Sequence, residues 1–390
     1  MYYIWIFLQI VIGYTLIFPL ILLLFSKFGN IKSVPGPPTA HEIDYAIIVT
    51  AYEQTHLISE AVNSILKLDY SNYLIYVVAD NCDITGLKFA NAKIILLKPE
   101  QVIASNVGSH FYAINNFKRN HERLVIIDSD NIVSRDFINE LNIFFNSGFL
   151  GVQGMRKPKN LNTPLAAVDA FRDIYYHYYD GMALFRTGSS ATLSGSGMGF
   201  SVELYKDCMK NHDIKGAGFD KVLQYEIVSK DLRIAFAEKA IVYDEKTSSS
   251  SQLVQQRSRW LFTWVKYFSL GFKLIHIGLN KSSVNQVLFG VVLLRPPLFI
   301  TLIMSFFFLI TNIWVDQVLV DIWIVLLMCY LISFLVPLFQ SGVDKRIHQS
   351  LTHIPEFIFY QIVSLFMIKS APGRSVATRH LNNPGEEQSI

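Results

Sequence analysis

The stretch Leu124-Val125-Ile126-Ile127-Asp128-Ser129-Asp130 decides the fold of this chain. Its first four residues are apolar and mostly β-branched, which predicts a short buried strand. Similar apolar runs precede it at 46–49, 74–79 and 93–97, and a helical pattern occupies 57–68. Strands that alternate with helices predict an α/β domain with a mostly parallel sheet. Ligands of such sheets bind at the carboxyl ends of the strands.

Acidic residues stand at two of these strand ends. Asp80 follows the second apolar run, and Asp128 follows the fourth. A reaction that releases a diphosphate needs a counter-charge, which Mg²⁺ or Mn²⁺ supplies through oxygen ligands. An Asp-x-Asp triplet alone is a weak signal, because turns after strands often contain Asp. Its position at a strand end makes Asp128 and Asp130 candidate metal ligands. Asp80 is a candidate donor contact or part of a solvated turn.

Three further segments are candidates for binding or chemistry. In Thr50-Ala51-Tyr52-Glu53 the aromatic ring can stack on a nucleobase or pack within a loop. The segment Gly195-Ser196-Gly197-Met198-Gly199 matches neither a P-loop nor GxGxxG. Its glycines allow the backbone to approach a sugar or another strand closely. Asp220, which opens a helical pattern, is either an N-cap or a general base.

The N-terminal segment predicts a membrane helix. Residues 2–26 carry no charge and are long enough to cross a bilayer. No basic residue precedes them, unlike in a signal peptide. Lys27 and Lys32 follow, so the positive-inside rule places the N-terminus outside and the next domain in the cytosol. The formal net charge of +3 does not suggest a nucleic-acid partner.

The C-terminal third predicts further membrane contact. Residues 251–276 mix aromatic and basic side chains, as interfacial helices do. They contain Gln256-Arg257-Ser258-Arg259-Trp260, whose basic and aromatic residues are common anchors at interfaces. Apolar runs follow at 284–314 and 318–339, and a weaker one at 354–368 either crosses or lies at the surface. Three separated cysteines form no zinc pattern and fit a reducing compartment.

The chain therefore divides into five predicted parts. These are an N-terminal transmembrane helix (1–27), a cytoplasmic catalytic domain (40–250), an interfacial amphipathic helix (251–280), a C-terminal membrane region of two to three helices (281–370) and a polar tail (371–390).

Four motifs in order resemble those of family 2 glycosyltransferases, of the membrane-integrated kind that includes cellulose, chitin and hyaluronan synthases. They are Asp80, Asp128-Ser129-Asp130, Phe219-Asp220 and Gln256-Arg257-Ser258-Arg259-Trp260. The resemblance covers about residues 44–265. It implies a GT-A fold, a UDP-sugar donor, and Mg²⁺ or Mn²⁺ as cofactor. The Glu that precedes the catalytic base in the family is replaced by Phe219 in this sequence.

The resemblance also implies a role for each matching position. The implied roles are uracil binding for Ala51, Tyr52 and Glu53; uridine contact for Asp80; donor and metal binding for Asp128 and Asp130, with Asp130 the more direct ligand; the catalytic base for Asp220; contact with the diphosphate and acceptor for Gln256, Arg259 and Trp260; and the acceptor path for Gly195, Ser196 and Gly197.

The predicted function is inverting transfer from a UDP-sugar to a growing polysaccharide or oligosaccharide, at the cytoplasmic face of the cell (inner) membrane. An alternative with the same motifs is a single transfer to a lipid or lipid-linked acceptor. A polymer tunnel needs many crossing helices, and the three or four expected here are few unless the chain forms a homo-oligomer. A non-enzymatic scaffold or transporter is the third alternative, which the intact Asp220 and Asp-x-Asp motif disfavour.

Overall fold

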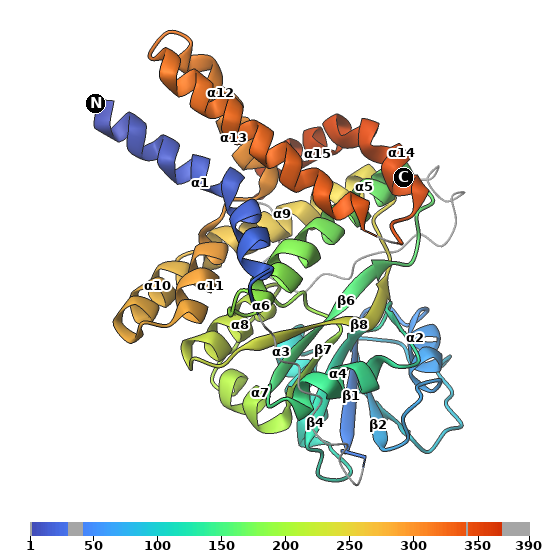
Figure 1. The fold of residues 1–390 in the computed structure, drawn as a ribbon. Helices are drawn as coiled ribbons and strands as arrows, with labels where there is room; N and C mark the ends of the chain where they lie inside the picture. The colour runs from blue at the N-terminus through green and yellow to red at the C-terminus, as the bar shows by residue number, and fades with distance from the viewer. Residues whose placement is uncertain (1, 30–41, 341, 369–390) are drawn as a thin grey trace.

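The computed structural model of the chain describes residues 2–29, 42–340 and 342–368 (Figure 1). The predicted polar tail, 371–390, lies outside the described residues. A domain built on one sheet forms one end of the molecule, and a group of helices projects from it. Helices from both ends of the chain, α1 and α13, lie side by side in this projection.

One mixed sheet organises the first domain. Its order is β3-β2-β1-β4-β7-β6-β8-β5, and β1, β2, β3 and β4 are parallel to one another. The short β7 runs antiparallel between β4 and β6, while β6 and β8 are parallel. The strands are β1 (Tyr45–Tyr52), β2 (Tyr73–Asp80), β3 (Ile94–Leu97), β4 (Arg123–Asp128), β5 (Ile132–Val133), β6 (Gly151–Pro158), β7 (Met198–Ser201) and β8 (Ile234–Asp244). The predicted α/β fold with a mostly parallel sheet is confirmed.

The central strands are buried because helices pack against the sheet. Ile48 and Val49 on β1 and Val77 and Val78 on β2 are fully inaccessible, as expected for continuous apolar runs in parallel strands. Helices that contact the strands include α2 (Ile58–Ile65), α3 (Asn106–Asn115), α4 (Phe137–Asn146), α7 (Val202–Met209) and α8 (Phe219–Ser229).

The remaining helices join the sheet domain to the projection. They are α1 (Tyr2–Ser26), α5 (Pro164–Tyr176), the π-helix η1 (His177–Ala183), α6 (Leu184–Arg186), α9 (Ser250–Tyr267), α10 (Leu270–Lys281), α11 (Val284–Leu294), α12 (Leu298–Asn312), α13 (Gln317–Leu335), η2 (Val336–Phe339), α14 (Lys345–Gln349), η3 (Ser350–His353) and α15 (Ile354–Phe366).

The interfacial segment predicted as one helix over 251–280 consists of two, α9 and α10. The second forms a tight hairpin with α11. A Cβ on Gly271 would lie only 2.7 Å from the backbone oxygen of Gly290, so glycine is needed where these helices touch. This close contact holds α10 against α11.

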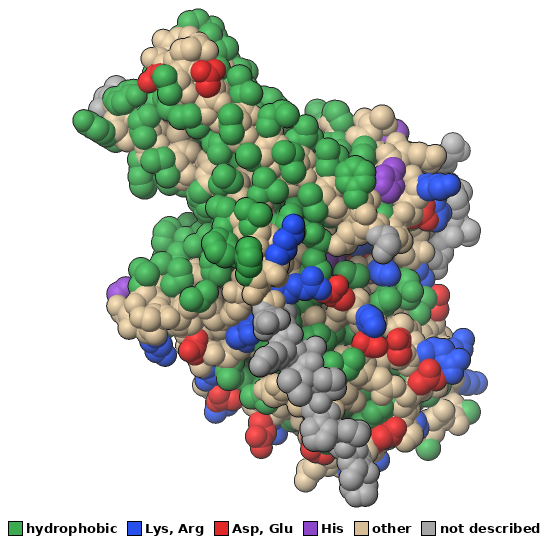
Figure 2. Space-filling model, viewed as in Figure 1, with side chains coloured by type: hydrophobic (Ala, Val, Ile, Leu, Met, Phe, Trp, Pro, Cys, Tyr) green, Lys and Arg blue, Asp and Glu red, His purple; other side chains and the backbone are tan. Residues whose placement is uncertain are grey.

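Two of the described helices, Tyr2–Ser26 and Gln317–Phe339, are long and apolar enough to cross a membrane. The pair α11 and α12 adds a third candidate if its 72° bend counts as one broken span. Figure 2 shows apolar side chains over the projecting helices and charged ones over the sheet domain. Within the projection, Gln9 Oε1 accepts hydrogen bonds from Asn312 Nδ2 (2.6 Å) and Trp323 Nε1 (2.5 Å). This polar cluster links α1, α12 and α13, as polar side chains do between membrane helices.

The weaker apolar run at 354–368 forms α15, which has 13 residues. That is short for a crossing, which needs about 20 residues. The helix packs against α9 and contacts α5 and α12, beside the sheet domain. Its main consequence for function is that it brings Phe357 to the cavity described next.

Candidate active site

A cavity of about 680 Å³ lies between the carboxyl ends of the strands and the helices α5, α8, α9 and α12. Its size is typical of a small-molecule site. The structure brings most of the predicted site residues to its wall. These are Ala51, Tyr52, Asp80, Asp128, Asp130, Gly195, Asp220, Gln256, Arg259 and Trp260. Glu53, Ser196 and Gly197 do not line it.

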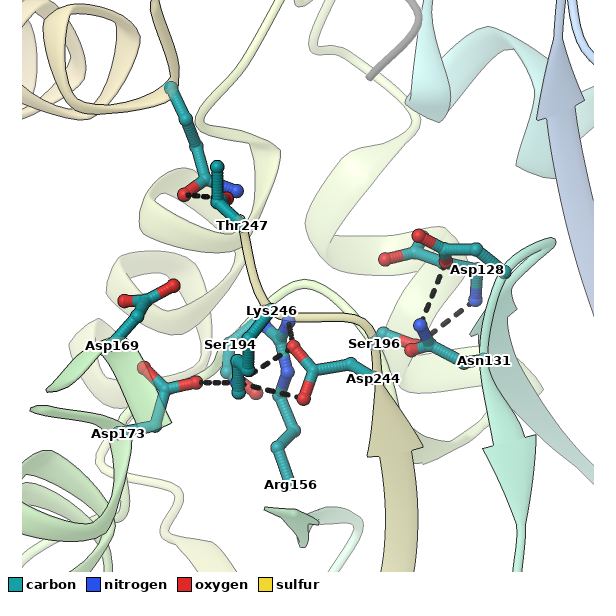
Figure 3. A network of polar contacts seen from close by, with 12 residues as sticks. Asp128, Asn131, Arg156, Asp169, Asp173, Ser194, Ser196, Asp244, Lys246 and Thr247 are labelled. Carbon is teal, nitrogen blue, oxygen red and sulfur yellow. Dashed lines mark hydrogen bonds and ion pairs between the residues drawn. The ribbon is translucent and has the colours of Figure 1, made fainter. Parts of the chain in front are cut away.

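Hydrogen bonds hold the Asp128–Asp130 turn in place (Figure 3). The backbone N–H of Asp128 donates to Ser196 Oγ (3.0 Å), and this hydroxyl donates to Asn131 Oδ1 (2.6 Å). Asn131 Nδ2 in turn donates to Asp130 Oδ1 (2.8 Å). Ser196 is fully buried. Ser196, which the resemblance assigns to the acceptor path, therefore supports the acidic turn.

Several carboxylates lie close together at the acidic turn. Burial, and then the neighbouring Asp130, raise the pKa of Asp128 to about 7, while Arg156 opposes them. The more distant Asp244 and Asp220 also favour its protonated form. Carboxylates crowded in this way are stabilised by a bound cation.

The residues present fit a divalent ion that is shared with a substrate. Among the described residues, no group of three or more His, Cys, Asp and Glu side chains is placed to hold a metal alone. Mg²⁺ commonly takes one or two carboxylates and completes its shell with substrate phosphates and water. Asp128 and Asp130 could hold such an ion together with a diphosphate.

Asp220 is the second residue of α8 and is partly buried at the cavity wall. The N-cap position belongs to Gly218, so the capping interpretation of Asp220 is wrong. Gly218 has φ +105°, and a Cβ there would lie 2.7 Å from Thr263 Cγ2 and 2.6 Å from the ring of Tyr267. Close packing of α9 on the start of α8 therefore sets Asp220 beside the helix that carries Gln256.

Asp80 performs a structural task at the cavity wall. It is buried, and its carboxylate accepts hydrogen bonds from the backbone N–H groups of Ile103 (3.0 Å) and Ala104 (2.7 Å). Ala104 has φ +49°, so these bonds hold a strained loop. Nearby, Glu53 also has a positive φ, and its side chain accepts from Asn81 Nδ2 (3.3 Å).

The two predicted glycines of the acceptor path have different surroundings. Gly195 has φ +89° and open space where a Cβ would stand, at the cavity wall. Gly197 has φ +66°, and a Cβ would lie 2.7 Å from Val242 Cγ2. Gly195 is thus free to approach a ligand, whereas Gly197 lets β8 pack closely.

The predicted Gln-x-x-Arg-Trp motif lies on α9, facing α5. Thr247 Oγ1 donates to Gln256 Oε1 (3.4 Å). The guanidinium carbons of Arg257 and Arg172 lie 4.0 Å and 4.4 Å from the Trp260 ring centroid. Arg257, which the motif leaves undefined, is buried and pairs with Asp169 on α5.

A network of ion pairs at the same wall was not predicted. Asp244, the last residue of β8, pairs with Arg156 and Lys246, and Lys246 also pairs with Asp173 (Figure 3). Arg172 bonds Asp169 and Asp173. One signal was available: Asp244 ends a strand, as Asp80 and Asp128 do.

Comparisons with known proteins agree with this geometry. A family model described as "Glycosyltransferase like family 2" matches residues 41–263. No curated protein matches the chain. The mannosyltransferase PcManGT from Pyrobaculum calidifontis, solved with GDP-Man and Mn²⁺, has a similar structure, at 14% identity over 93% of this chain and 97% of that chain (TM-score 0.59). S. aureus TarS 1–349 also matches, at 16% identity over 85% and 92% of the two chains (TM-score 0.43).

The likeness to the mannosyltransferase confirms the predicted GT-A fold. The family model covers more than half of the described residues and includes the cavity-lining positions Asp80, Asp128, Asp130 and Asp220. The chain therefore belongs to glycosyltransferase-like family 2 and is a glycosyltransferase, as its motifs predict.

Proposed function

We propose that the chain is an inverting, metal-dependent glycosyltransferase that moves a sugar from a nucleoside-diphosphate sugar to a hydroxyl of an acceptor held at the membrane. One observation carries the proposal: a single cavity contains Asp128 and Asp130, the carboxylate of Asp220, and Gln256 and Arg259. Inversion needs one base opposite the leaving group, which Asp220 provides.

The side chains around the cavity divide the work. Asp128 and Asp130 would hold Mg²⁺ or Mn²⁺ against the diphosphate, and the bound ion would offset the charge that develops on this leaving group. Tyr52 provides a ring for the nucleobase. Arg259 and Gln256 offer donors to the diphosphate. Asp220 accepts the proton of the acceptor hydroxyl.

The donor nucleotide is open to direct test. The sequence resemblance implies UDP, whereas the structurally similar mannosyltransferase was solved with GDP-Man and Mn²⁺. A panel of UDP- and GDP-sugars on membranes that contain the chain, with Mn²⁺, Mg²⁺ or EDTA, should give metal-dependent release of one nucleoside diphosphate. Absence of release with every donor and metal would overturn the proposal and favour a scaffold.

The orientation proposed for the chain follows its basic residues. Lys27 follows α1, and Lys345 and Arg346 begin α14, after the second candidate span. Basic residues next to membrane helices favour the cytoplasmic side. The sheet domain is therefore proposed to lie in the cytoplasm at the inner membrane.

The number of candidate spans favours a single transfer over polymer synthesis. The described chain offers two, or three with the bent pair, which is few for a polymer tunnel. The cavity is also lined by helices of the membrane region. Product length with a radiolabelled donor separates the alternatives: one added sugar supports single transfer to a lipid or lipid-linked acceptor, and a ladder of long products supports a polysaccharide synthase.

A further inference from the structure

The cavity has an apolar part that the donor and the base do not use. Its walls come from α12, α13 and α15 and include Leu298, Phe299, Leu302, Tyr330, Phe334 and Phe357. Both α12 and α13 belong to the candidate membrane spans. We call this part of the cavity the apolar arm. Its lining is suited to a hydrocarbon chain.

A cluster of cations lines the same cavity. Arg156, Arg172, Lys246 and Arg257 pair there with Asp169, Asp173 and Asp244. In these ion pairs four cations share three carboxylates, and the charge of Arg156 also acts on Asp128. We call the four cations and their three carboxylates the cationic cluster. A buried cation whose donors are not all paired is stabilised by a ligand of opposite sign.

Arg257 is the member of the cluster with the most unused bonding capacity. Its side chain is 4% exposed, and one terminal nitrogen bonds Asp169. Its Nε and its other terminal nitrogen are buried and have no partner among the described residues. Burial, and then the nearby Arg172, lower its pKa to about 10. A guanidinium with two donor nitrogens that no protein group uses matches the oxygens of a phosphate.

We propose that the cationic cluster binds the phosphate of an amphiphilic acceptor through Arg257, that the acceptor's hydrocarbon chain occupies the apolar arm, and that its hydroxyl reaches Asp220. This inference rests on the proposed function and specifies its acceptor: a phosphate-bearing lipid with a free hydroxyl.

The transfer step leaves this phosphate unchanged. The bond from the anomeric carbon to the donor diphosphate breaks, and the diphosphate leaves with the electron pair. The acceptor oxygen forms the new bond to the anomeric carbon, and its proton passes to the Asp220 carboxylate. The bound phosphate positions the acceptor for this step.

The cationic cluster is distinct from the donor end in one testable respect. Asp128 and Asp130 carry negative charge, so a diphosphate binds beside them only with a metal ion. The cationic cluster needs no metal to hold an anion. Binding of the lipid phosphate is therefore expected in EDTA, where donor binding is lost.

The test uses the full-length chain in phosphatidylcholine nanodiscs, with radiolabelled dodecyl phosphate as probe, EDTA present and empty nanodiscs as background. Arg257→Met should weaken binding by about 10-fold or more, the effect expected for lost charged hydrogen bonds. Arg257→Lys keeps the charge but loses the forked donors, so its affinity for dodecyl phosphate should lie between those of the wild type and Arg257→Met. Arg346→Met removes an exposed arginine that pairs with Asp344 and should leave binding unchanged.

Two competitors identify which part of the probe is recognised. Unlabelled dodecanol supplies the chain without the anion, and inorganic phosphate supplies the anion without the chain. Each should compete about 10-fold or more less well than dodecyl phosphate, because each lacks one half of the contact. Inorganic phosphate that competes equally well would overturn the lipid assignment.

Nucleotide binding with Mn²⁺ serves as the folding control. It should survive in Arg257→Met, since this change leaves three cations opposite three carboxylates. If Arg257→Met lost nucleotide binding but kept dodecyl phosphate binding, the cationic cluster would belong to the donor site and the inference would be overturned. Equal affinity for dodecyl phosphate in the wild type and both Arg257 variants would also overturn it. Nucleotide release without Arg257-dependent probe binding refutes only this inference. Probe binding without any nucleotide release refutes the proposed function.

Discussion

The two ends of the cavity hold charged groups of opposite sign. At the donor end, burial and neighbouring carboxylates raise the pKa of Asp128 to about 7. At the other end, burial and a neighbouring arginine lower the pKa of Arg257 to about 10. Both pKa shifts favour the neutral form of the buried group, in one case a carboxylic acid and in the other a guanidine. The two proposed ligands, a metal ion at the acidic end and an anion at the basic end, would each stabilise the charged form.

The largest expected effect removes the proposed base at the acidic end. Asp220→Asn should lower the rate of transfer by about 10²–10⁴-fold, the usual contribution of general base catalysis, and leave nucleotide affinity unchanged. Initial rates and nucleotide binding measure the two quantities. Asp213→Asn, an exposed carboxylate in the preceding loop, is the matched control and should keep full activity. An unchanged transfer rate in Asp220→Asn would show that Asp220 is not the general base.

The next effect separates the two ends directly. Asp130→Ala should weaken Mn²⁺-dependent nucleotide binding by about 10–100-fold, as changes at metal sites do. Dodecyl phosphate binding in EDTA should stay unchanged, since it belongs to the basic end. Titration of nucleotide with and without Mn²⁺ provides the measurement, and the exposed Asp136→Ala is the control. A parallel loss of both ligands would mean that the ends are not independent.

A smaller effect concerns the support of the acidic turn. Ser196→Ala leaves the Asp128 N–H and the Asn131 side-chain oxygen without their shared partner. A buried polar group left unpaired costs about 1–3 kcal/mol of unfolding free energy. Ser194 is a close control, because its hydroxyl oxygen is buried and has no hydrogen-bond partner within the described part of the chain, so Ser194→Ala should cost less. Thermal unfolding of the purified variants compares them, and equal losses would contradict the support proposed for Ser196.

The smallest effect is a pH-dependent stabilisation by metal. The raised pKa of Asp128 means that the folded state binds its proton more tightly than the unfolded state, where the pKa is near 3.8. The stabilisation that comes from this bound proton is complete below pH 3.8, and it is lost as the pH rises through about 7. Mn²⁺ should therefore raise the melting temperature more at pH 8 than at pH 5.5, by a few °C. Equal increases in melting temperature at both pH values would argue against this account. So would an Asp128→Asn variant in which Mn²⁺ still stabilises more at pH 8 than at pH 5.5.

The fold was predictable because it depends on local patterns. Continuous apolar runs marked β1 to β4, and the acidic residues that follow two of them lie at the expected edge of the sheet. The candidate metal turn, Asp220 and the Gln-x-x-Arg-Trp helix all meet at one cavity. The order of these motifs along the chain was enough to expect that they meet at one site. The roles assigned to their residues stay predictions until the variants are measured.

The polar contacts were not predictable because their partners are distant in sequence. Ser196 supports Asp128 from 68 residues away, and Asp80 bonds backbone groups 23 and 24 residues later. Asp169 and Arg172 fall in an ordinary helical sequence, where charges usually face solvent. Asp169 is buried and pairs with Arg257 of α9, a contact that no local pattern on α5 reports.

The helices that wall the apolar arm have a second face. On α12, Phe299 and Leu302 line the cavity while Phe306 and Ile310 are exposed. On α13, Tyr330 lines it while Val325 and Met328 are exposed. Membrane helices tilt when the hydrocarbon thickness departs from their length. A tilt of α12 or α13 would reshape the acceptor's binding space, so turnover should follow the acyl-chain length of the surrounding phospholipid, and bilayer thickness would act as a physical regulator of this enzyme.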